Sequence, residues 1–376
     1  MKNIYVILAL TLAFTSCKKE GCTDETASNF NENAKKDDGS CVYDPAYVVP
    51  TTYSFVDENG VSTVDYSGQT ARMNQLREMV AYLSTGTTNT LSAQQLKDMF
   101  SNTNGNGNGA FTFTSTKQLK DKCFALDQTL FESFMDSVAL ASNSFSQIAS
   151  NGQSGYLMNL DGEKKLFYKN GIEYAQVIQK GLMGAVFMYQ ALNNYFSTAE
   201  MDVDNATNVS GKNYTMMEHH WDEAFGYFGV NANFPTVAAE DFWGEYCNEH
   251  NGSLNSNKIM MDNFLKGRAA IVANVLTDRD AAILEIKNMW EKIAAYAAMG
   301  EINEAIAAYN AGDQASFLHL ASEAYGFVLC LRYAPLETRK MTNSELDAVL
   351  AKFGTNFWNL NLTKLNEIKA DIDAKY

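Results

Sequence analysis

The chain has 376 residues, of which 46% are hydrophobic and only four are prolines. This composition predicts a globular, mainly helical body, and the length allows two domains. The 44 acidic and 29 basic residues give a net charge of −15. A surface of that sign repels nucleic acid and anionic lipid, so it excludes a nucleic-acid partner and favours cations or cationic surfaces.

Residues 1–16 are typical of an export signal peptide. Lys2 precedes an apolar run from Ile4 to Phe14, which is about half the length that a helix needs to cross a bilayer. The run ends in Thr15-Ser16-Cys17, which resembles a bacterial lipoprotein signal in which Cys17 becomes the acylated first residue. The alternative is an ordinary signal peptide that contains a cysteine. The lipoprotein interpretation predicts a lipid anchor at the outer membrane, on its periplasmic or exterior face.

Residues 17–50 form a polar, acidic segment that we interpret as a spacer after the lipid. Cys22 and Cys41 bracket a loop in it, and an oxidising location would let them form a disulfide. Residues 21–44 are similar to a small module of exported Bacteroidetes proteins, with Gly-Cys-Thr-Asp at one end and Asp-Asp-Gly-Ser-Cys at the other. The side chains that offer oxygen ligands for calcium are Asp24, Asn29, Asn31, Asp37 and Asp38. The alternative is that they only form turns.

After residue 50 the pattern predicts a short hairpin followed by helices. Asn59-Gly60 lies between alternating apolar residues of 53–66, which is a strong hairpin signal. Apolar spacing predicts helices after Gly68 and over about 91–100, 116–148, 172–196, 238–250, 258–276, 281–299, 315–333, 346–353 and 363–374, with another around His219-His220. Gly181 and Gly184 should let a neighbouring helix approach closely. Residues 102–109, rich in Asn and Gly, are expected to form a flexible loop.

Three other cysteines lie in this body. Cys123 and Cys330 fall in apolar helical stretches and are expected to be buried, and Cys247 is the third. An odd number leaves at least one free thiol, or a further bridge whose pairing the sequence does not show.

Two similar segments, 219–227 and 319–327, hold three of the four histidines of the chain. We call them the first and second His/Glu segments. Residues three or four apart share a helix face, so Glu223 can meet His219 or His220, and Glu323 can meet His319. Imidazole and carboxylate together suit iron or zinc. The candidate metal ligands are His219, His220, Asp222, Glu223, His319 and Glu323.

Other interpretations of these segments remain open. Adjacent histidines point about 100° apart on a helix, so at most one of His219 and His220 is an ideal ligand. The histidines could instead pack against a partner helix while the acids are solvated, and Arg72 and Arg268 are candidates to pair with those acids. The recurrence itself suggests a duplicated helical unit, and two such units could bring both segments to a shared interface.

Three stretches carry a resemblance to a known family: 62–72, 179–185 and 214–227, the last reading Tyr-Thr-Met-Met-Glu-His-His-Trp-Asp-Glu-Ala-Phe-Gly-Tyr. On them the chain resembles a family of uncharacterised Bacteroidetes lipoproteins, the domain of unknown function 4856. A more distant similarity is to the imelysin-like proteins, exported and iron-regulated, which carry a Gly-x-His-x-x-Glu motif. His220 to Glu223 matches the His-x-x-Glu part, but Glu218 stands in place of the Gly and His219 is extra.

These resemblances imply an all-α domain over residues 51–376, with the small β-hairpin at its N-terminus. The domain would hold two related helix bundles, with pseudo-repeats over about 160–235 and 255–340. They also imply a role in metal uptake.

The favoured hypothesis is an exported lipoprotein that binds iron or a similar metal, or a metal-bearing ligand, between the two bundles. An outer-membrane transport protein is a candidate partner. One alternative is a zinc-type hydrolase or peptidase that uses the His-x-x-Glu cluster, and another is a structural or protein-interaction lipoprotein. The sequence has no His-Glu-x-x-His helix motif, phosphate-binding Gly loop or Cys-x-x-Cys pair, which weighs against an enzyme.

Overall fold

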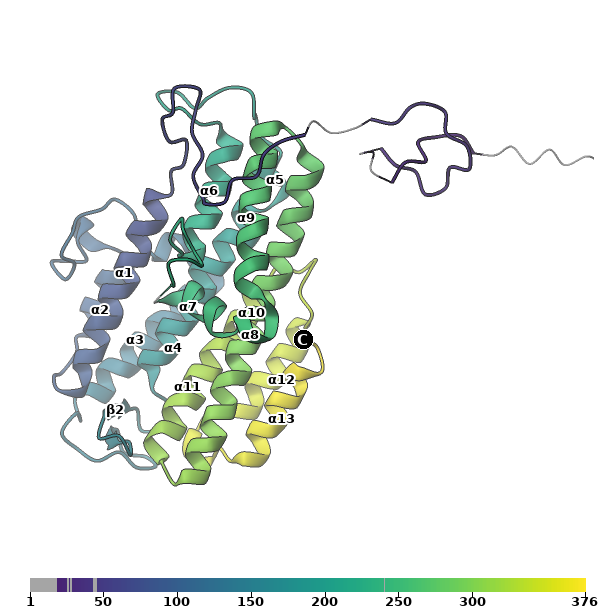
Figure 1. The fold of residues 1–376 in the computed structure, drawn as a ribbon. Helices are drawn as coiled ribbons and strands as arrows, with labels where there is room; N and C mark the ends of the chain where they lie inside the picture. The colour runs from purple at the N-terminus through teal and green to yellow at the C-terminus, as the bar shows by residue number, and fades with distance from the viewer. Residues whose placement is uncertain (1–18, 26, 28, 43–45, 240) are drawn as a thin grey trace, which may run out of the picture. The chain divides into compact units, whose positions relative to one another are not determined.

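A computed structural model describes residues 19–25, 27, 29–42, 46–239 and 241–376 (Figure 1). The predicted export signal and the lipidation site at Cys17 lie outside these residues. The chain divides into two units, residues 1–47 and residues 48–376.

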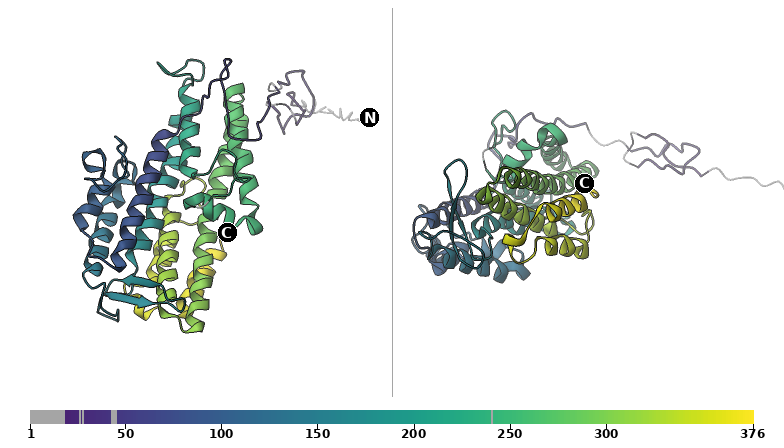
Figure 2. Two further views of the ribbon diagram at one scale, coloured as in Figure 1. Left: turned by 60° about the vertical axis from the view of Figure 1, so that its left-hand side comes forward. Right: turned by 90° about the horizontal axis from the view of Figure 1, so that it is seen from below.

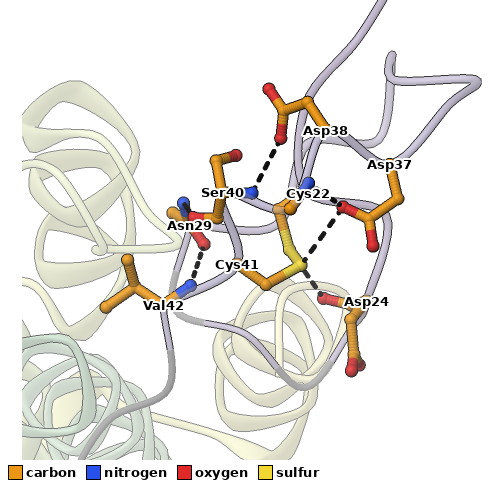
Figure 3. Close-up of a disulfide and its surroundings, with 9 residues drawn as sticks. Cys22, Asp24, Asn29, Asp37, Asp38, Ser40, Cys41 and Val42 are labelled. Atoms are coloured by element: carbon orange, nitrogen blue, oxygen red, sulfur yellow. Dashed lines mark hydrogen bonds between the residues drawn. A yellow bond between two sulfur atoms is a disulfide. The ribbon is translucent and has the colours of Figure 1, made fainter.

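In the first unit, a disulfide joins Cys22 to Cys41, as the sequence predicted (Figure 3). The side chain of Asn29 also holds this loop, through the backbone on either side of Cys41. Its amide group donates to the carbonyl oxygen of Ser40 at 2.6 Å, and its Oδ1 accepts from the backbone N–H of Val42 at 2.8 Å. The unit therefore depends on one covalent bond and a few side chain to backbone hydrogen bonds.

The aspartates proposed as calcium ligands act as turn formers in this loop (Figure 3). Asp37 Oδ1 accepts from the backbone N–H of Gly39 at 3.0 Å, and Asp38 Oδ1 accepts from that of Ser40 at 2.9 Å. The hydrogen bonds from Ser40 lower the pKa of Asp38. These contacts fit the turn-forming interpretation, and calcium binding by the module stays a prediction.

The second unit is mainly helical, and its longer helices run roughly along one direction (Figures 1 and 2). Its α-helices among the described residues are α1 (Ser67–Ser84), α2 (Ala93–Phe100), α3 (Gln128–Ser142), α4 (Tyr174–Leu182), α5 (Thr198–Met201), α6 (Met216–Phe228), α7 (Phe242–Glu249), α8 (Asn251–Leu254), α9 (Ser256–Ala273), α10 (Leu276–Ala311), α11 (Gln314–Cys330), α12 (Asn343–Phe353) and α13 (Leu362–Asp373). Two π-helical segments, η5 (Met183–Met188) and η6 (Gln190–Tyr195), continue α4.

The 36-residue helix α10 is the long element of the fold, about 54 Å at 1.5 Å per residue. Short turns at Asn274 and Gly312, both with positive φ, connect it to α9 and α11. Helix α9 therefore packs back along the first half of α10, and α11 packs back along its second half. None of the helices that the structure describes is both long and apolar enough to cross a membrane.

The expected hairpin is present but short. Val56 and Ser62 form a single antiparallel bridge around Asn59-Gly60. A longer pair, β1 (Gly155–Met158) with antiparallel β2 (Lys164–Phe167), was not predicted.

Two other expectations need correction. The helix predicted over 116–148 begins only at Gln128, because the preceding chain follows the backbone of η5, where Phe124 N–H donates to Ala185 O at 2.8 Å. The loop 102–109 is packed rather than free. Asn102 is buried, and its amide donates to the carbonyl oxygens of Ser115 and Lys117 at 2.7 and 2.6 Å.

Helix α4 and η5 lie very close to α11. A Cβ atom on Gly184 would lie 2.6 Å from Cys330 Sγ and 2.8 Å from its Cα. One on Gly181 would lie 2.7 Å from the ring of Phe131. The close approach predicted for these glycines is confirmed. It lets the buried Cys330 thiol donate to Lys180 O at 3.1 Å. Cys123 and Cys247 are likewise buried and free.

We expect Gly184→Ala to lower the free energy of unfolding by about 1 to 3 kcal/mol, because the added methyl group overlaps the backbone of α11. Gly252→Ala is the matched control, since Gly252 is also helical but has no atom within 4 Å of its Cβ position. Urea unfolding followed by circular dichroism compares the variants. Equal stabilities would contradict the close packing of η5 on α11.

Candidate functional site

The first His/Glu segment lies on α6, whose start is fixed by a capping box. Thr215 Oγ1 accepts from the backbone N–H of Glu218 at 3.2 Å, and Glu218 Oε2 accepts from that of Thr215 at 2.8 Å. This reciprocal pair satisfies two free N–H groups at the helix start. Because the capping box fixes where α6 begins, it also fixes the faces of the helix on which the following histidines and acids lie.

The two adjacent histidines have different partners. His219 Nε2 lies 3.8 Å from Glu223 Oε2, and its ring stacks on Tyr214 with centroids 4.8 Å apart. His220 contacts a different acid. Both ring nitrogens of His220 face Glu200, with Nδ1 2.7 Å from its backbone oxygen and Nε2 3.1 Å from Oε2.

Glu223 is held by neutral donors. Its Oε1 accepts from Gln69 Nε2 at 2.9 Å and from the Tyr195 hydroxyl at 3.1 Å. Gly226, one turn later, faces α1 with no room for a side chain, since a Cβ there would lie 2.5 Å from Tyr66 Cβ. The close approach predicted at Gly226 is therefore confirmed.

Asp222 and Glu218 bind a guanidinium group. Arg268 on α9 is fully buried, and its Nε donates to Asp222 Oδ1 at 3.0 Å while Nη1 donates to Glu218 Oε1 at 2.7 Å. The third donor, Nη2, reaches Thr63 Oγ1 at 3.0 Å. The pairing that the sequence suggested for Arg268 is confirmed, whereas Arg72 donates to Gln118 O and lies near Asp121.

The N-terminal strap, residues 53–65, closes over this ion pair. The Tyr53 hydroxyl donates to Asp222 Oδ1 at 2.7 Å, and the backbone N–H of Asp65 donates to Oδ2 at 3.3 Å. The Tyr53 ring stacks on Phe225 with centroids 3.6 Å apart. Burial raises the pKa of Asp222 to about 6, with Arg268 as the main opposing influence. Asp222 is therefore the anion that neutralises Arg268.

The second His/Glu segment lies on α11 and has a different environment. His319 Nδ1 is 2.7 Å from Glu173 Oε2, just before α4, and Nε2 is 3.4 Å from Glu323 Oε1. Burial alone would lower the pKa of His319, but the charges of Glu173 and Glu323 and the bond to Glu173 raise it. The imidazole is therefore held between carboxylates that approach it from two helices.

Glu323 is the centre of this cluster. Its Oε2 lies 3.6 Å from Lys180 Nζ, which in turn donates to the Tyr246 hydroxyl at 2.6 Å. Glu301 on α10 shares a hydrogen bond with Glu323, and burial together with that neighbouring charge raises the pKa of Glu301 to about 9. Glu304 also raises it, while Lys180 lowers it. This shift favours the protonated form of Glu301 at neutral pH.

The structure does not bring the two segments together. Helix α6 packs on α9 along the first half of α10, and α11 packs along its second half (Figure 1). Within the described part of the chain, no three His, Cys, Asp or Glu side chains are already arranged to hold a metal ion.

The sequence pattern gave no sign of Glu173 and Glu301. Each stands in an unremarkable local sequence and reaches the cluster only through helix packing.

The family model for a domain of unknown function, DUF4856, matches residues 50–376. The chain belongs to the DUF4856 family. No curated protein and no solved structure matches the chain.

In this DUF4856 protein, we expect Arg268→Gln to cost about 3 to 5 kcal/mol of stability, because it leaves the buried Asp222 and Glu218 without a counter-ion. Lys266→Gln is the control. Lys266 lies on the same helix and loses the same charge, but its ion pair with Asp278 is half exposed, and such pairs contribute about 0 to 1 kcal/mol. Similar losses in both variants by urea unfolding would exclude this role for Arg268.

The pH dependence of stability should show the proton on Glu301. The folded protein keeps this proton from about pH 4.5 to pH 9, whereas the unfolded chain loses it near pH 4.5, so the free energy of unfolding falls as pH rises through this window. The contribution of the His319 imidazolium changes in the same direction: it is complete below pH 6.5 and is lost as pH rises through the raised pKa.

We therefore expect Glu301→Gln to become more stable than the wild type as pH rises from 5.5 to 8.5, by roughly 1 to 3 kcal/mol at the upper end. Denaturation is measured in the presence of EDTA at three pH values. Glu304→Gln, an exposed change one turn away, should leave the pH profile near that of the wild type. A Glu301→Gln profile parallel to the wild type would show that Glu301 ionises normally.

Proposed function

We propose that this protein is an exported lipoprotein that binds a divalent metal ion, iron or zinc, at the second His/Glu segment. The ligands would be His319 through Nε2, with Glu323 and Glu301. The observation that carries the proposal is the placement of His319, whose two ring nitrogens each lie within 3.4 Å of a different carboxylate.

The contact between Glu173 and Nδ1 of His319 supports metal binding at the other ring nitrogen, Nε2. Metal-bound histidines almost always donate their other ring N–H to a carboxylate or carbonyl, which fixes the tautomer and makes the ligand more basic. Glu173 Oε2, 2.7 Å from Nδ1, is placed to accept that bond. This leaves Nε2 on the side of Glu323, where an imidazole and two carboxyl groups offer the mixed donor set that iron and zinc accept.

Deprotonation of Glu301 would favour binding of a cation at this site. Loss of the proton from Glu301 would add a second carboxylate beside Glu323, and metal binding releases protons from its ligands. Lys180 competes with the metal for Glu323 at 3.6 Å, but its ammonium group also has the Tyr246 hydroxyl as a partner. Affinity should therefore rise with pH, and Lys180→Met should tighten binding.

The first His/Glu segment serves a structural role in this proposal. His220 is taken by Glu200, Asp222 by Arg268, and Glu223 by Gln69 and Tyr195. A metal ion there would have to displace a guanidinium from a fully buried position, which leaves a buried charge unpaired.

The location and partner follow from the sequence. The lipoprotein signal ending at Cys17 supports an anchor at the outer membrane, and the disulfide between Cys22 and Cys41 suits an oxidising compartment. The distant resemblance to the imelysin-like proteins supports a role in metal uptake, with an outer-membrane transport protein as partner. Replacement of Cys17 by Ala should release the protein from the membrane fraction.

The test is the metal content of the purified mature protein after incubation with Fe²⁺ or Zn²⁺ and desalting. We expect about one ion per chain in the wild type and a loss of at least tenfold in affinity for His319→Ala and Glu323→Gln. No bound metal in the wild type, at either pH 6.5 or pH 8, would falsify the proposal.

The double variant His219→Ala, Glu223→Gln is the matched control, because it removes the same two chemical groups at the same spacing from α6. It should keep its metal. Metal that is lost from this variant and retained in His319→Ala would move the site to the first His/Glu segment. Circular dichroism of each variant confirms that it is folded.

A further inference from the structure

One cavity of about 500 Å³ shares no lining residue with either His/Glu segment. Such a volume is within the range of small-molecule sites in proteins. It lies where η6 meets the chain that follows α11, and its walls include Phe124, Tyr189, Asn193, Tyr333 and Arg339. Arg332, which also lines it, is 13 positions beyond His319, or roughly 20 Å along a helix.

The floor of this cavity is built by an unusual backbone. Tyr189 lies between the π-helical segments η5 and η6, and Asn193 lies within η6. Two consecutive π-helical segments are rare, and π-helical turns occur frequently at functional sites. Asn193 Nδ2 donates to Tyr333 O at 2.6 Å and so ties η6 to the opposite wall. The cavity is therefore held open by hydrogen bonds between two rigid elements.

Aromatic rings form one side of the cavity. The ring of Phe124 meets Tyr189 edge to face at 5.1 Å and Tyr333 at 5.8 Å. The Tyr333 hydroxyl donates to Asp127 Oδ2 at 2.7 Å, which fixes its ring. At the rim, Leu126 and Leu336 are 81% and 73% exposed. These surfaces suit a flat or apolar group.

The cavity is also lined by Arg339. Burial lowers the pKa of its guanidinium, and the charge of Glu291 opposes that shift without lying within ion-pair distance. Arg332 is paired with Asp347. Arg339 makes no ion pair among the described residues. Its Nη1 and Nη2 donate to Arg332 O and Asn343 Oδ1, both neutral, at 2.9 Å, and its Nε is buried with no hydrogen-bond partner. In a chain of net charge −15, a half-buried guanidinium in this state is an open position for an anion.

We propose that this cavity binds a small aromatic carboxylate, with its ring against Phe124 and Tyr189 and its carboxylate on Arg339. The proposal combines the aromatic wall with the unpaired guanidinium, which together select a planar ring bearing a negative group. It does not depend on the metal site, because it shares no residue with the His319 cluster.

Binding of benzoate, 4-hydroxyphenylacetate and indole-3-acetate is measured by saturation-transfer NMR and calorimetry on the mature protein. Benzamide tests the charge, and acetate tests the ring. We expect the aromatic acids to bind at least tenfold more tightly than either, and Arg339→Gln to lose about tenfold in affinity. Absence of binding by all three acids at 20 mM, or equal binding of benzoate and benzamide, overturns the proposal.

Two further variants distinguish specific binding in the cavity from a non-specific effect of surface charge. Arg77→Gln removes an arginine from α1 that also lies beside an aromatic ring, at 5.7 Å from Phe242, and it should bind the acids as the wild type does. Tyr189→Leu keeps the apolar volume but removes the ring, and it should weaken the aromatic acids while leaving acetate unchanged. If Arg77→Gln lost as much affinity as Arg339→Gln, the binding would be a non-specific effect of charge, and the proposal would be wrong.

Discussion

The packing of α6, α9 and the N-terminal strap depends on one ion pair, between the buried guanidinium of Arg268 and two carboxylates of α6. Arg268 is fully buried and donates to acceptors in two other parts of the chain: Asp222 and Glu218 on α6, and Thr63 in the N-terminal strap. A buried cation is tolerated only when every donor has a partner, and here each of its nitrogen atoms has one. The strap, α6 and α9 are thus fixed relative to one another by charge as well as by apolar packing.

The second half of the unit is organised by close backbone contact. Gly184 lets η5 approach α11, Gly181 lets α4 approach Phe131 of α3, and Gly326 lets Lys180 lie directly on α11, where a Cβ would be 2.7 Å from Lys180 Cβ. This contact carries Lys180 to Glu323, and α10 supplies Glu301 to the same carboxylate. The proposed cation site lies in this half, where Glu173, Glu301 and Glu323 gather around His319 and Lys180.

The helices themselves were largely predictable, since their apolar periodicity is a local property. The segments around α9, α11, α12 and α13 were predicted within three residues of their observed limits, whereas the helix predicted over 281–299 extends as α10 from Leu276 to Ala311. The errors arose where tertiary contacts replaced helical hydrogen bonds. The chain before α3 forms two short 3₁₀ turns, Lys120–Lys122 and Ala125–Asp127, and between them Phe124 bonds to η5. The Asn-rich loop is held by Asn102, which reaches two carbonyl groups. Neither contact has a local sequence signal.

The sequence by itself determined the family, the helical class, the disulfide and the glycines that permit close contact, because each depends on residue type and short spacing. It also showed that imidazole and carboxylate recur at i and i+4. Only the tertiary structure decided what those groups do. The same local pattern lies beside Arg268 on α6 and beside Glu173 and Glu301 on α11, so the two copies have different charged partners. The charge state of a buried side chain depends on neighbours that are distant in sequence, and only packing supplies them.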